Sequence, residues 1–371
     1  MSEPARPRAR DLGIAVGVLP AGPLNAITDV PGVRVGHCTV SWGGPELPHG
    51  SGPARTGVTA VFPHDGDLWN ERVVAGAFVA NGVGEVIGIS AIREWGLIET
   101  PILLTNSQSA GAVYDAAVRW MMDRDPRVGV DDAVIPVVGE CDDGFLNVLR
   151  GMHVHAVHVR AALDSAAAGP VAEGCVGAGT GMSCYDFKAG IGTSSRGVTA
   201  HGRSYTVGVL ALTNFGFRRR LQVDGVPVGR EIADLMPLDN REGSCIVVLA
   251  TDAPLSARQC ERMAKRCSLG LAATGSYASD GSGEIMVAFS TARRTPRVSA
   301  ELRTVVSVAN DQMHQLFEGA VDATAESVVN SICAARTTVG RDGNIAFALP
   351  LDRLVDTLRR HGREARLPDG V

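Results

Sequence analysis

The sequence predicts a mixed α/β fold, built as one large domain or as two domains of average size. Segments with helical spacing alternate along the chain with short apolar runs typical of buried strands, and glycine-rich turns separate them. The chain has 371 residues, of which 45% are hydrophobic, and this is enough for a sizeable core. No Pro/Ser-rich linker or block of charge divides the chain, and nothing repeats at a period of about 20 to 50 residues.

The first half of the chain contains one clear helix and one clear strand. Residues 107–122 have the spacing of an amphipathic helix, with Ser107 or Ser109 as its cap. Residues 133–138 form a short apolar run and are expected to be a buried strand. A second strand is expected at residues 205–212, where an apolar run stops at a threonine and an asparagine.

The second half begins with the most apolar run of the chain, residues 245–250, which suits a strand covered on both faces. A helix follows, and Ser256 and Gln259 form a capping box at its start. Residues 285–289 are the next expected strand. Residues 311–335 are expected to form the last long helix, with an apolar stripe along one face.

The charge balance argues against a nucleic-acid partner. The formal charge is -5, from 35 basic and 40 acidic residues, so no broad basic face attracts phosphates. No apolar run reaches the length of about 18 residues that a membrane helix needs. Residues 6–10 are basic and precede an apolar stretch, but two glycines interrupt that stretch, so a mature N-terminus and a cytoplasmic location are expected. Only the first ten residues and roughly the last ten after Arg360 are expected to be loose.

Neither a metal site nor a disulfide framework is indicated. The eight cysteines include no Cys-x-x-Cys pair, and most are expected to be small buried side chains. His153 and His155 would share one face of a strand, with His158 on the other, and two ligands without nearby carboxylates are too few for a metal.

Three further segments have a structural and a functional interpretation. Residues 177–181 read Gly-x-Gly-x-Gly, which lacks the spacing of a dinucleotide-binding loop, so a close backbone approach is the favoured interpretation. Residues 188–196 are rich in small polar donors and either line a site or form a tight pair of loops. The three arginines at 218–220 are expected in a solvated loop or an interface patch.

The most informative region lies between residues 242 and 284. Ser244 stands between a glycine and the most apolar strand, which would carry its hydroxyl into the interior. Ser282 and Glu284 stand at the start of the next apolar strand. Each feature alone is typical of a turn or a solvated cap. Together they place two hydroxyls and a carboxylate at the starts of two buried strands, as for a nucleophile with a polar relay.

These residues belong to an ordered set of motifs that runs along almost the whole chain. The set comprises residues 8–13, 25–37, 104–107, 138–140, 177–182, 188–196, 212–214, 243–244, 281–284, 340–343 and 348–352. With this set the chain resembles the self-processing aminopeptidases, the family of the L-aminopeptidase D-amidase/D-esterases and the β-aminopeptidases.

The resemblance implies a fold and a maturation step. The family fold is a four-layer αββα sandwich of the N-terminal-nucleophile type, shared with the ornithine acetyltransferases. Residues 1–371 would form a single catalytic domain that cuts itself between Gly243 and Ser244. The products would be an α chain of residues 1–243 and a β chain of residues 244–371. The new α-amino group of Ser244 would then act as the base for its own hydroxyl.

The resemblance also implies roles for individual side chains. Ser244 would be the nucleophile, and Ser282 and Glu284 would orient it and stabilise its ammonium form. Asn214 would donate its amide to the oxyanion of the tetrahedral intermediate. Glu140 would receive the free amino group of the substrate. The loop at residues 140–148 departs from the family's pattern, so the preferred N-terminal residue and its stereochemistry stay open.

The expected function is therefore that of a serine aminopeptidase or amidase. It would release N-terminal residues from short peptides, amino-acid amides or esters without a cofactor, as a homo-oligomer, a tetramer of processed α/β pairs. Two alternatives stay open. One is an acyltransferase like the ornithine acetyltransferases, although Ser244 stands where these use threonine. The other is a binding protein that keeps the fold and never cleaves itself.

Overall fold

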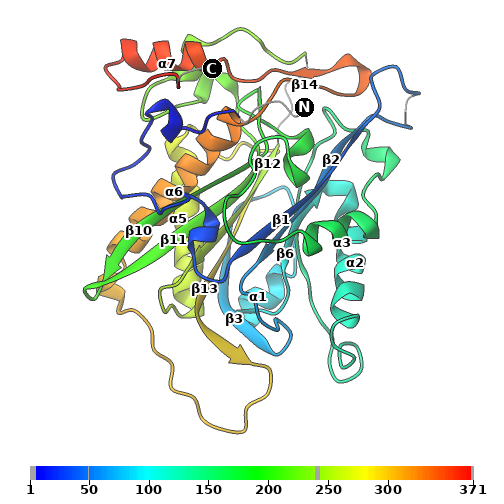
Figure 1. Cartoon of the computed structure of the whole chain (residues 1–371), viewed down its shortest axis with the longest axis vertical. Helices are drawn as coiled ribbons and strands as arrows, with labels where there is room; N and C mark the ends of the chain where they lie inside the picture. Colours follow the sequence, from blue (N-terminus) through cyan, green and yellow to red (C-terminus); the bar gives the residue numbers. More distant parts are fainter. Residues whose placement is uncertain (1–5, 49, 239–242, 369–371) are drawn as a thin grey trace.

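Two β-sheets form the centre of the molecule in the computed structural model, which describes residues 6–48, 50–238 and 243–368 (Figure 1). The first sheet contains, in spatial order, β1 (Arg34–Trp42), β2 (Ala54–Phe62), β6 (Ile102–Asn106), β7 (Val137–Cys141) and β4 (Val86–Ile87). The second contains β10 (Ile191–Ala200), β11 (Arg203–Asn214), β12 (Ser244–Thr251), β13 (Gly283–Pro296), β3 (Glu71–Gly82) and β5 (Leu97–Ile98). Two small pairs are β8 (Ser183–Cys184) with β9 (Phe187–Lys188), and β14 (Thr338–Val339) with β15 (Ile345–Ala346).

Helices cover the outer faces of both sheets. The α-helices are α1 (Ile89–Trp95), α2 (Ala110–Met122), α3 (Ala156–Asp164), α4 (Val228–Glu231), α5 (Ala257–Ala273), α6 (His314–Cys333) and α7 (Leu351–Arg360). Short 3-10 helices are η1 (Arg10–Leu12), η2 (Ile27–Asp29), η3 (Ser107–Ser109), η4 (Leu149–Gly151), η5 (Gly177–Gly181), η6 (Arg218–Arg220), η7 (Asn310–Gln312) and η8 (Arg341–Gly343).

Three hydrophobic clusters separate four layers. One cluster lies between the six-stranded sheet and the helices α5 and α6. The second lies between the two sheets and takes side chains from the strands of both. The third lies between the five-stranded sheet and the helices α2 and α3. Figure 1 shows α5 and α6 on one side of the sheets and α2 and α3 on the other. The expected αββα sandwich is therefore confirmed.

Strand β12 is buried along its whole length, as its apolar sequence predicts. Its alternate side chains enter different layers: Val247 and Leu249 face the helices, while Ile246 and Val248 face the other sheet. β12 runs antiparallel to β11 and parallel to β13. The parallel pair requires a crossover, which α5 provides. Ser256 caps this helix as expected, accepting a 3.3 Å hydrogen bond from the backbone N–H of Gln259.

The helix expected at residues 107–122 begins later and has a different cap. Its α-helical part is α2, and the turn before it is η3. The side chain of Asn106 caps this turn by accepting from the backbone N–H of Ser109 at 3.0 Å. Ser109 occupies the N-cap position of α2 as expected, but its side chain makes no capping hydrogen bond, and the hydroxyl of Ser107 donates to Glu140.

The strand expected at residues 133–138 is shifted toward the C-terminus, to β7. Pro136 has no N–H to donate, and the N–H of Ile135 is bound by the Glu99 side chain at 3.1 Å. Pairing with the parallel neighbour β6 therefore begins only at Val137. The other expected strands, β11, β12 and β13, extend beyond their apolar runs because the pairing continues into polar residues.

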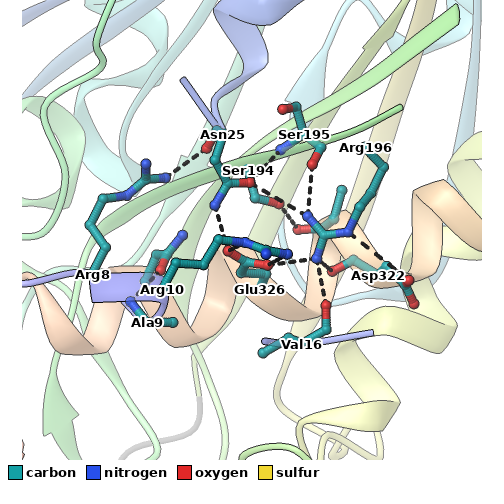
Figure 2. Close-up of polar contacts among 12 residues, drawn as sticks. Arg8, Ala9, Arg10, Val16, Asn25, Ser194, Ser195, Arg196, Asp322 and Glu326 are labelled. Atoms are coloured by element: carbon teal, nitrogen blue, oxygen red, sulfur yellow. Dashed lines mark hydrogen bonds and ion pairs between the residues drawn. The ribbon is translucent and has the colours of Figure 1, made fainter. Parts of the chain in front are cut away.

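A buried ion-pair network fixes the N-terminal segment, so the expectation that the first ten residues are loose is wrong for the described residues 6–10 (Figure 2). Arg196 on β10 and Glu326 on α6 are both fully buried and pair at 2.6 Å. Arg10 reaches the same carboxylate at 2.9 Å, and Asn25 also donates to it. The end of the chain is held too, since the N–H of Arg366 donates to the Leu12 carbonyl at 2.8 Å.

Replacing Glu326 with Gln is expected to destabilise the protein by about 3–5 kcal/mol, because it leaves the buried charge of Arg196 without its carboxylate. Urea unfolding followed by circular dichroism measures the change. Glu318→Gln on the exposed face of the same helix is the matched control and should change stability by less than about 0.5 kcal/mol. Equal stability of the two variants would contradict the importance of the network.

Candidate active site

Three neighbouring strands bring the predicted polar residues to one edge of the six-stranded sheet. β11 ends at Asn214, and β12 and β13 begin at Ser244 and Gly283. The register pairs Asn214 with Ser244 and Ser244 with Gly283. Gly283 stands in the sequence between Ser282 and Glu284. The other three residues predicted for the catalytic set therefore stand next to the first residue of β12, Ser244, or next to its partner Gly283.

Ser244 is almost inaccessible, with 6% of its surface exposed. It shares a face of β12 with Ile246 and Val248, and this face packs against the five-stranded sheet. The strand thus carries the hydroxyl toward the space between the two sheets, as its sequence position predicts. A hydroxyl in such a place meets few water molecules and faces groups of both sheets.

Ser282 and Glu284 form a buried pair beside Ser244. The hydroxyl of Ser282 donates to Oε1 of Glu284, and each residue exposes no more than 2% of its surface. Glu284 stands opposite Cys245 in the parallel register, and a bulge in the pairing of β13 with β3 follows directly after it. Bulges re-aim side chains next to active sites. The sequence alone suggested a solvated cap for such a carboxylate, and its burial shows that it is not one.

Gly243 and Asn214 lie so close that only a glycine fits before Ser244. A Cβ on Gly243 would lie 1.8 Å from the carbonyl oxygen of Asn214 and 2.9 Å from its Nδ2. The Asn214 side chain is itself fixed at both ends. Its Oδ1 accepts from the N–H of Ser183 at 3.0 Å, and its Nδ2 donates to the carbonyl of Asp142 at 2.7 Å.

Glu140 approaches the same place from the other sheet, near the end of β7. Its Oε1 accepts from the N–H of Glu85 at 2.8 Å, and its Oε2 accepts from the hydroxyl of Ser107. Burial raises the pKa of the Glu140 carboxyl, against the opposing effect of these two hydrogen bonds. A Cβ on Gly84 would lie 3.5 Å from Oε1 of Glu140 and 3.7 Å from Oγ of Ser244. The carboxylate and the hydroxyl therefore border one small space.

The loop after Glu140 connects the two sides of the site. Asp142 holds the Asn214 amide through its carbonyl, as described above. Asp143 is fully buried and accepts from Nδ2 of Asn147 at 2.8 Å. Burial raises the pKa of Asp143 to about 7. Through the carbonyl of Asp142, this loop contacts the Asn214 amide beside the candidate substrate space.

The glycine-rich segment η5 is a close backbone approach, as predicted. Gly177 has a φ of +51°, and a Cβ there would lie 2.4 Å from the Thr59 hydroxyl on β2. Lys188 fixes the segment from inside: its buried ammonium donates to the carbonyls of Gly179 at 3.1 Å and Met182 at 2.8 Å. Lys188 therefore stabilises a tight loop and does not line the substrate space. Ser183, which follows Met182, orients the Asn214 amide by donating its backbone N–H to Oδ1.

Sequence analysis did not find Ser107 as a site residue, and the strand expected for His153 and His155 is wrong. Ser107 was assigned to a helix cap, and no local signal pointed to its contact with Glu140. His153 and His155 lie outside the strands, and the N–H of His155 donates to Nδ1 of His158 at 3.0 Å. Residues 6–48, 50–238 and 243–368 contain no group of three His, Cys, Asp or Glu side chains that could hold a metal ion.

Arg218 is buried rather than solvated, unlike the loop expected at residues 218–220. Its guanidinium donates to the carbonyls of Tyr185 and Ile232 at 3.0 Å and lies 3.2 Å from the ring centre of Phe187. Burial lowers the pKa of Arg218 to about 10. Within the described part of the chain, no helix is both long and apolar enough to cross a bilayer.

Comparisons with known proteins agree with this arrangement. The model of peptidase family S58 matches residues 25–346. The chain is 43% identical to the β-peptidyl aminopeptidase BapA of Sphingosinicella microcystinivorans, over 97% of this chain and 93% of that protein. The solved β-aminopeptidase of Burkholderia sp. is 43% identical, with a TM-score of 0.89 over 96% of this chain and 99% of its own.

A second solved structure links the chain to a known fold. The L-aminopeptidase D-Ala-esterase/amidase of Ochrobactrum anthropi is 42% identical, with a TM-score of 0.91 over 97% of this chain and 100% of its own. That enzyme is described as a prototype for the serine aminopeptidases and as a variant of the Ntn hydrolase fold. This likeness extends to the whole αββα arrangement.

Proposed function

The chain belongs to peptidase family S58 and is a serine aminopeptidase, and we propose that Ser244 is its nucleophile, freed by self-cleavage after Gly243. One observation carries the proposal. Asn214 pairs with Ser244 in the register, and Ser244 also pairs with Gly283, which stands between Ser282 and Glu284; this arrangement supports the proposal. The precursor would become one chain of residues 1–243 and another of residues 244–371.

The proposed maturation step needs only Gly243, Ser244 and one water molecule. Oγ of Ser244 attacks the carbonyl carbon of Gly243, the C–N bond between the two residues breaks, and the hydroxyl proton passes to the departing nitrogen. The chain is then joined by an ester. Water hydrolyses this ester and leaves a carboxylate on Gly243 and a free amine and hydroxyl on Ser244. Because Gly243 lacks a side chain, its carbonyl is accessible to a nucleophile on the adjacent residue.

The mature Ser244 would carry out hydrolysis with its own amine as the base. An α-amino group has a reference pKa of about 7.7 to 8.0, so a useful fraction is neutral near pH 7. The amine takes the proton of Oγ, Oγ attacks the substrate carbonyl, and the leaving amine takes the proton. The buried Ser282–Glu284 pair would favour the ammonium that forms between these steps.

Asn214 is suited to stabilising the oxyanion. Its Nδ2 carries two N–H donors, of which one is bound by the Asp142 carbonyl. The other would donate to the developing negative charge. The fixed position of the amide means that it need not reorganise during the reaction, which is what makes such donors effective.

Glu140 gives the site its preference for a free N-terminus. A substrate ammonium next to this carboxylate would gain the partner that it needs away from water. Because Glu140 and Ser244 border one small space, the amine bound by Glu140 belongs to the residue whose carbonyl Ser244 attacks. Short peptides, amino-acid amides and esters fit this description. The names of two relatives, 43% and 42% identical, make β-aminoacyl amides the first substrates to test.

We also propose a tetramer of processed pairs, located in the cytoplasm. An arm between β13 and α6 extends away from the body of the molecule (Figure 1). The arm exposes Val298, Leu302 and Val306, with 84%, 105% and 68% of their surfaces accessible. Large apolar side chains grouped in this way suit burial against another copy. All eight cysteines are free thiols, as suits a reducing compartment.

Ser244→Ala is expected to remain one chain of 38.7 kDa and to lose hydrolysis of aminoacyl p-nitroanilides. The wild-type protein should give two chains of about 25 and 13 kDa, in proportion to their lengths. Mass spectrometry of the purified proteins measures both. Ser290→Ala is the control, since Ser290 is also buried but lies further along β13 and donates to the Ala253 carbonyl. Cleavage of Ser244→Ala at the same bond would exclude Ser244 as the nucleophile.

Gly243→Ala is expected to slow self-cleavage at least about tenfold, because its methyl group would collide with the Asn214 carbonyl and displace the bond to be cut. A time course of fragment masses after synthesis measures the rate. Gly111→Ala is the matched control, since a Cβ at Gly111 meets no atom within 4 Å. Normal cleavage of Gly243→Ala would show that this close contact does not position the bond.

Glu140 is expected to add a second acidic limb to kcat/KM, at lower pH than the limb caused by protonation of the Ser244 α-amine. Its carboxyl must be ionised to bind an ammonium, and burial raises its pKa, so kcat/KM should fall as the pH drops through a value above the ordinary 4.3 or so. Glu140→Gln should lower kcat/KM about 10- to 100-fold and remove this limb. The exposed Glu94→Gln is the control. An unchanged pH profile in Glu140→Gln would contradict the assignment.

A further inference from the structure

The bend between β3 and β4, residues 83–85, lies against both halves of the candidate active site. A Cβ on Gly283 would lie 2.2 Å from the carbonyl oxygen of Val83, so the bend packs directly on the start of β13. On its other side, the N–H of Glu85 donates to Oε1 of Glu140 at 2.8 Å. The bend is therefore held at both ends, and Gly84 stands between these two contacts.

Gly84 leaves a gap between the carboxylate proposed to bind the amine and the proposed nucleophile. The point where its Cβ would stand is 3.5 Å from Oε1 of Glu140, 3.5 Å from Cα of Gly283 and 3.7 Å from Oγ of Ser244. Apart from Gly84 and its two chain neighbours, no atom of the described residues lies closer to this point. These are ordinary contact distances, and Gly84 does not have the positive φ that favours glycine. A methyl group would therefore fit the folded protein here.

The gap is closed toward the centre of the molecule and open toward the bend. A Cβ on Gly139 would lie 3.0 Å from the side chain of Ile246. These two residues belong to β7 and β12, the strands that carry Glu140 and Ser244, so the two strands touch just below the gap. Gly84, in contrast, is only half-buried. A substrate held between the carboxylate and the hydroxyl can therefore extend toward the bend, but not toward the core.

An aminoacyl unit bound at both ends is longer than this gap. With a hydrogen bond at its amine and an attacking oxygen at its carbonyl, an extended α-aminoacyl unit needs about 8 to 9 Å between the two oxygens. A β-aminoacyl unit has one more backbone carbon and needs about 10 Å. Oε1 of Glu140 and Oγ of Ser244 both lie within 3.7 Å of one point, so they are closer together than either length. Both units must curve, and the longer one curves further toward the bend.

We propose that Gly84 determines specificity for the length of the aminoacyl unit, because its missing side chain leaves the space that the additional carbon of a β-aminoacyl unit needs. This inference rests on the proposed roles of Ser244 and Glu140. Gly84 takes no part in binding the amine or in attacking the carbonyl. A methyl group at this position would leave both of those side chains in place and would remove only the space between them.

The test compares the hydrolysis of glycyl and β-alanyl p-nitroanilides, which carry no side chain and differ by one methylene group. For each protein, kcat/KM for the β-alanyl substrate is divided by kcat/KM for the glycyl substrate. Gly84→Ala is expected to lower this ratio at least about tenfold, because the space for one methylene group is lost in a closely packed site. An unchanged ratio in Gly84→Ala would overturn the proposal.

Gly82→Ala is the matched control, two residues earlier in the chain. A Cβ on Gly82 would meet only the side chain of Val79, at 3.7 Å, and no atom of Glu140 or Ser244 within 4 Å. The substitution adds the same methyl group outside the gap, so the ratio should equal that of the wild type. An equal fall of the ratio in Gly82→Ala and Gly84→Ala would overturn the proposal.

Mass spectrometry separates the loss of space from damage to the nucleophile. Gly84→Ala should be cleaved into the same two chains as the wild type, because its methyl group lies at an ordinary contact distance from Ser244. An uncleaved Gly84→Ala protein would overturn the role of Gly84, since the methyl group would then disturb Ser244 itself. Hydrolysis of neither substrate by the wild type would instead contradict the proposed function. An unchanged ratio in a cleaved and active Gly84→Ala protein would overturn only the role of Gly84.

Discussion

The active site depends on the register of a single buried strand. β12 is covered on one face by helices and on the other by the second sheet, so each of its side chains is assigned to one layer. A slip of one residue would turn Ser244 toward the helices and Cys245 toward the other sheet, exchanging the two apolar sets along the whole strand. The contact between Gly243 and the Asn214 carbonyl adds a second restraint at the point of entry. The burial that stabilises the sandwich therefore also holds the proposed nucleophile, Ser244, beside the amide of Asn214.

The two sheets supply different parts of the substrate site. Ser244 and Asn214 belong to the six-stranded sheet, while Glu140 belongs to the five-stranded one. The distance between the proposed nucleophile and the carboxylate proposed to bind the amine is thus set by packing between the sheets, where the side chain of Ile246 lies against Gly139. Because protein interiors are close-packed and hardly compressible, this distance changes little. With the proposed roles, a site divided in this way would select substrates by the distance from their amine to their carbonyl.

Local signals in the sequence predicted where helices and strands lie, but not which distant residues contact one another. The apolar run of β12 and the capping box of α5 lie within a few residues, and both were found where expected. The four-layer arrangement followed from the resemblance to a family and not from periodicity. Contacts between distant residues gave no local signal: Ser107 with Glu140, and Arg218 with the carbonyls around it. Charged side chains were assigned to the surface because burial of a charge depends on partners that the sequence does not show.

The buried carboxylate near Ser244 resolves a conflict that self-cleavage creates. A new amine in a dry interior has its pKa lowered by desolvation, which would leave it neutral but too weak a base to accept the hydroxyl proton. A neighbouring carboxylate acts in the opposite direction, since it favours the ammonium form. Glu284, held by Ser282 and paired in register with the residue after Ser244, is placed to supply that effect. In the proposed mechanism the site would therefore exclude water, which strengthens the interaction of Asn214 with the oxyanion, and the Ser244 amine would stay basic enough to accept the hydroxyl proton.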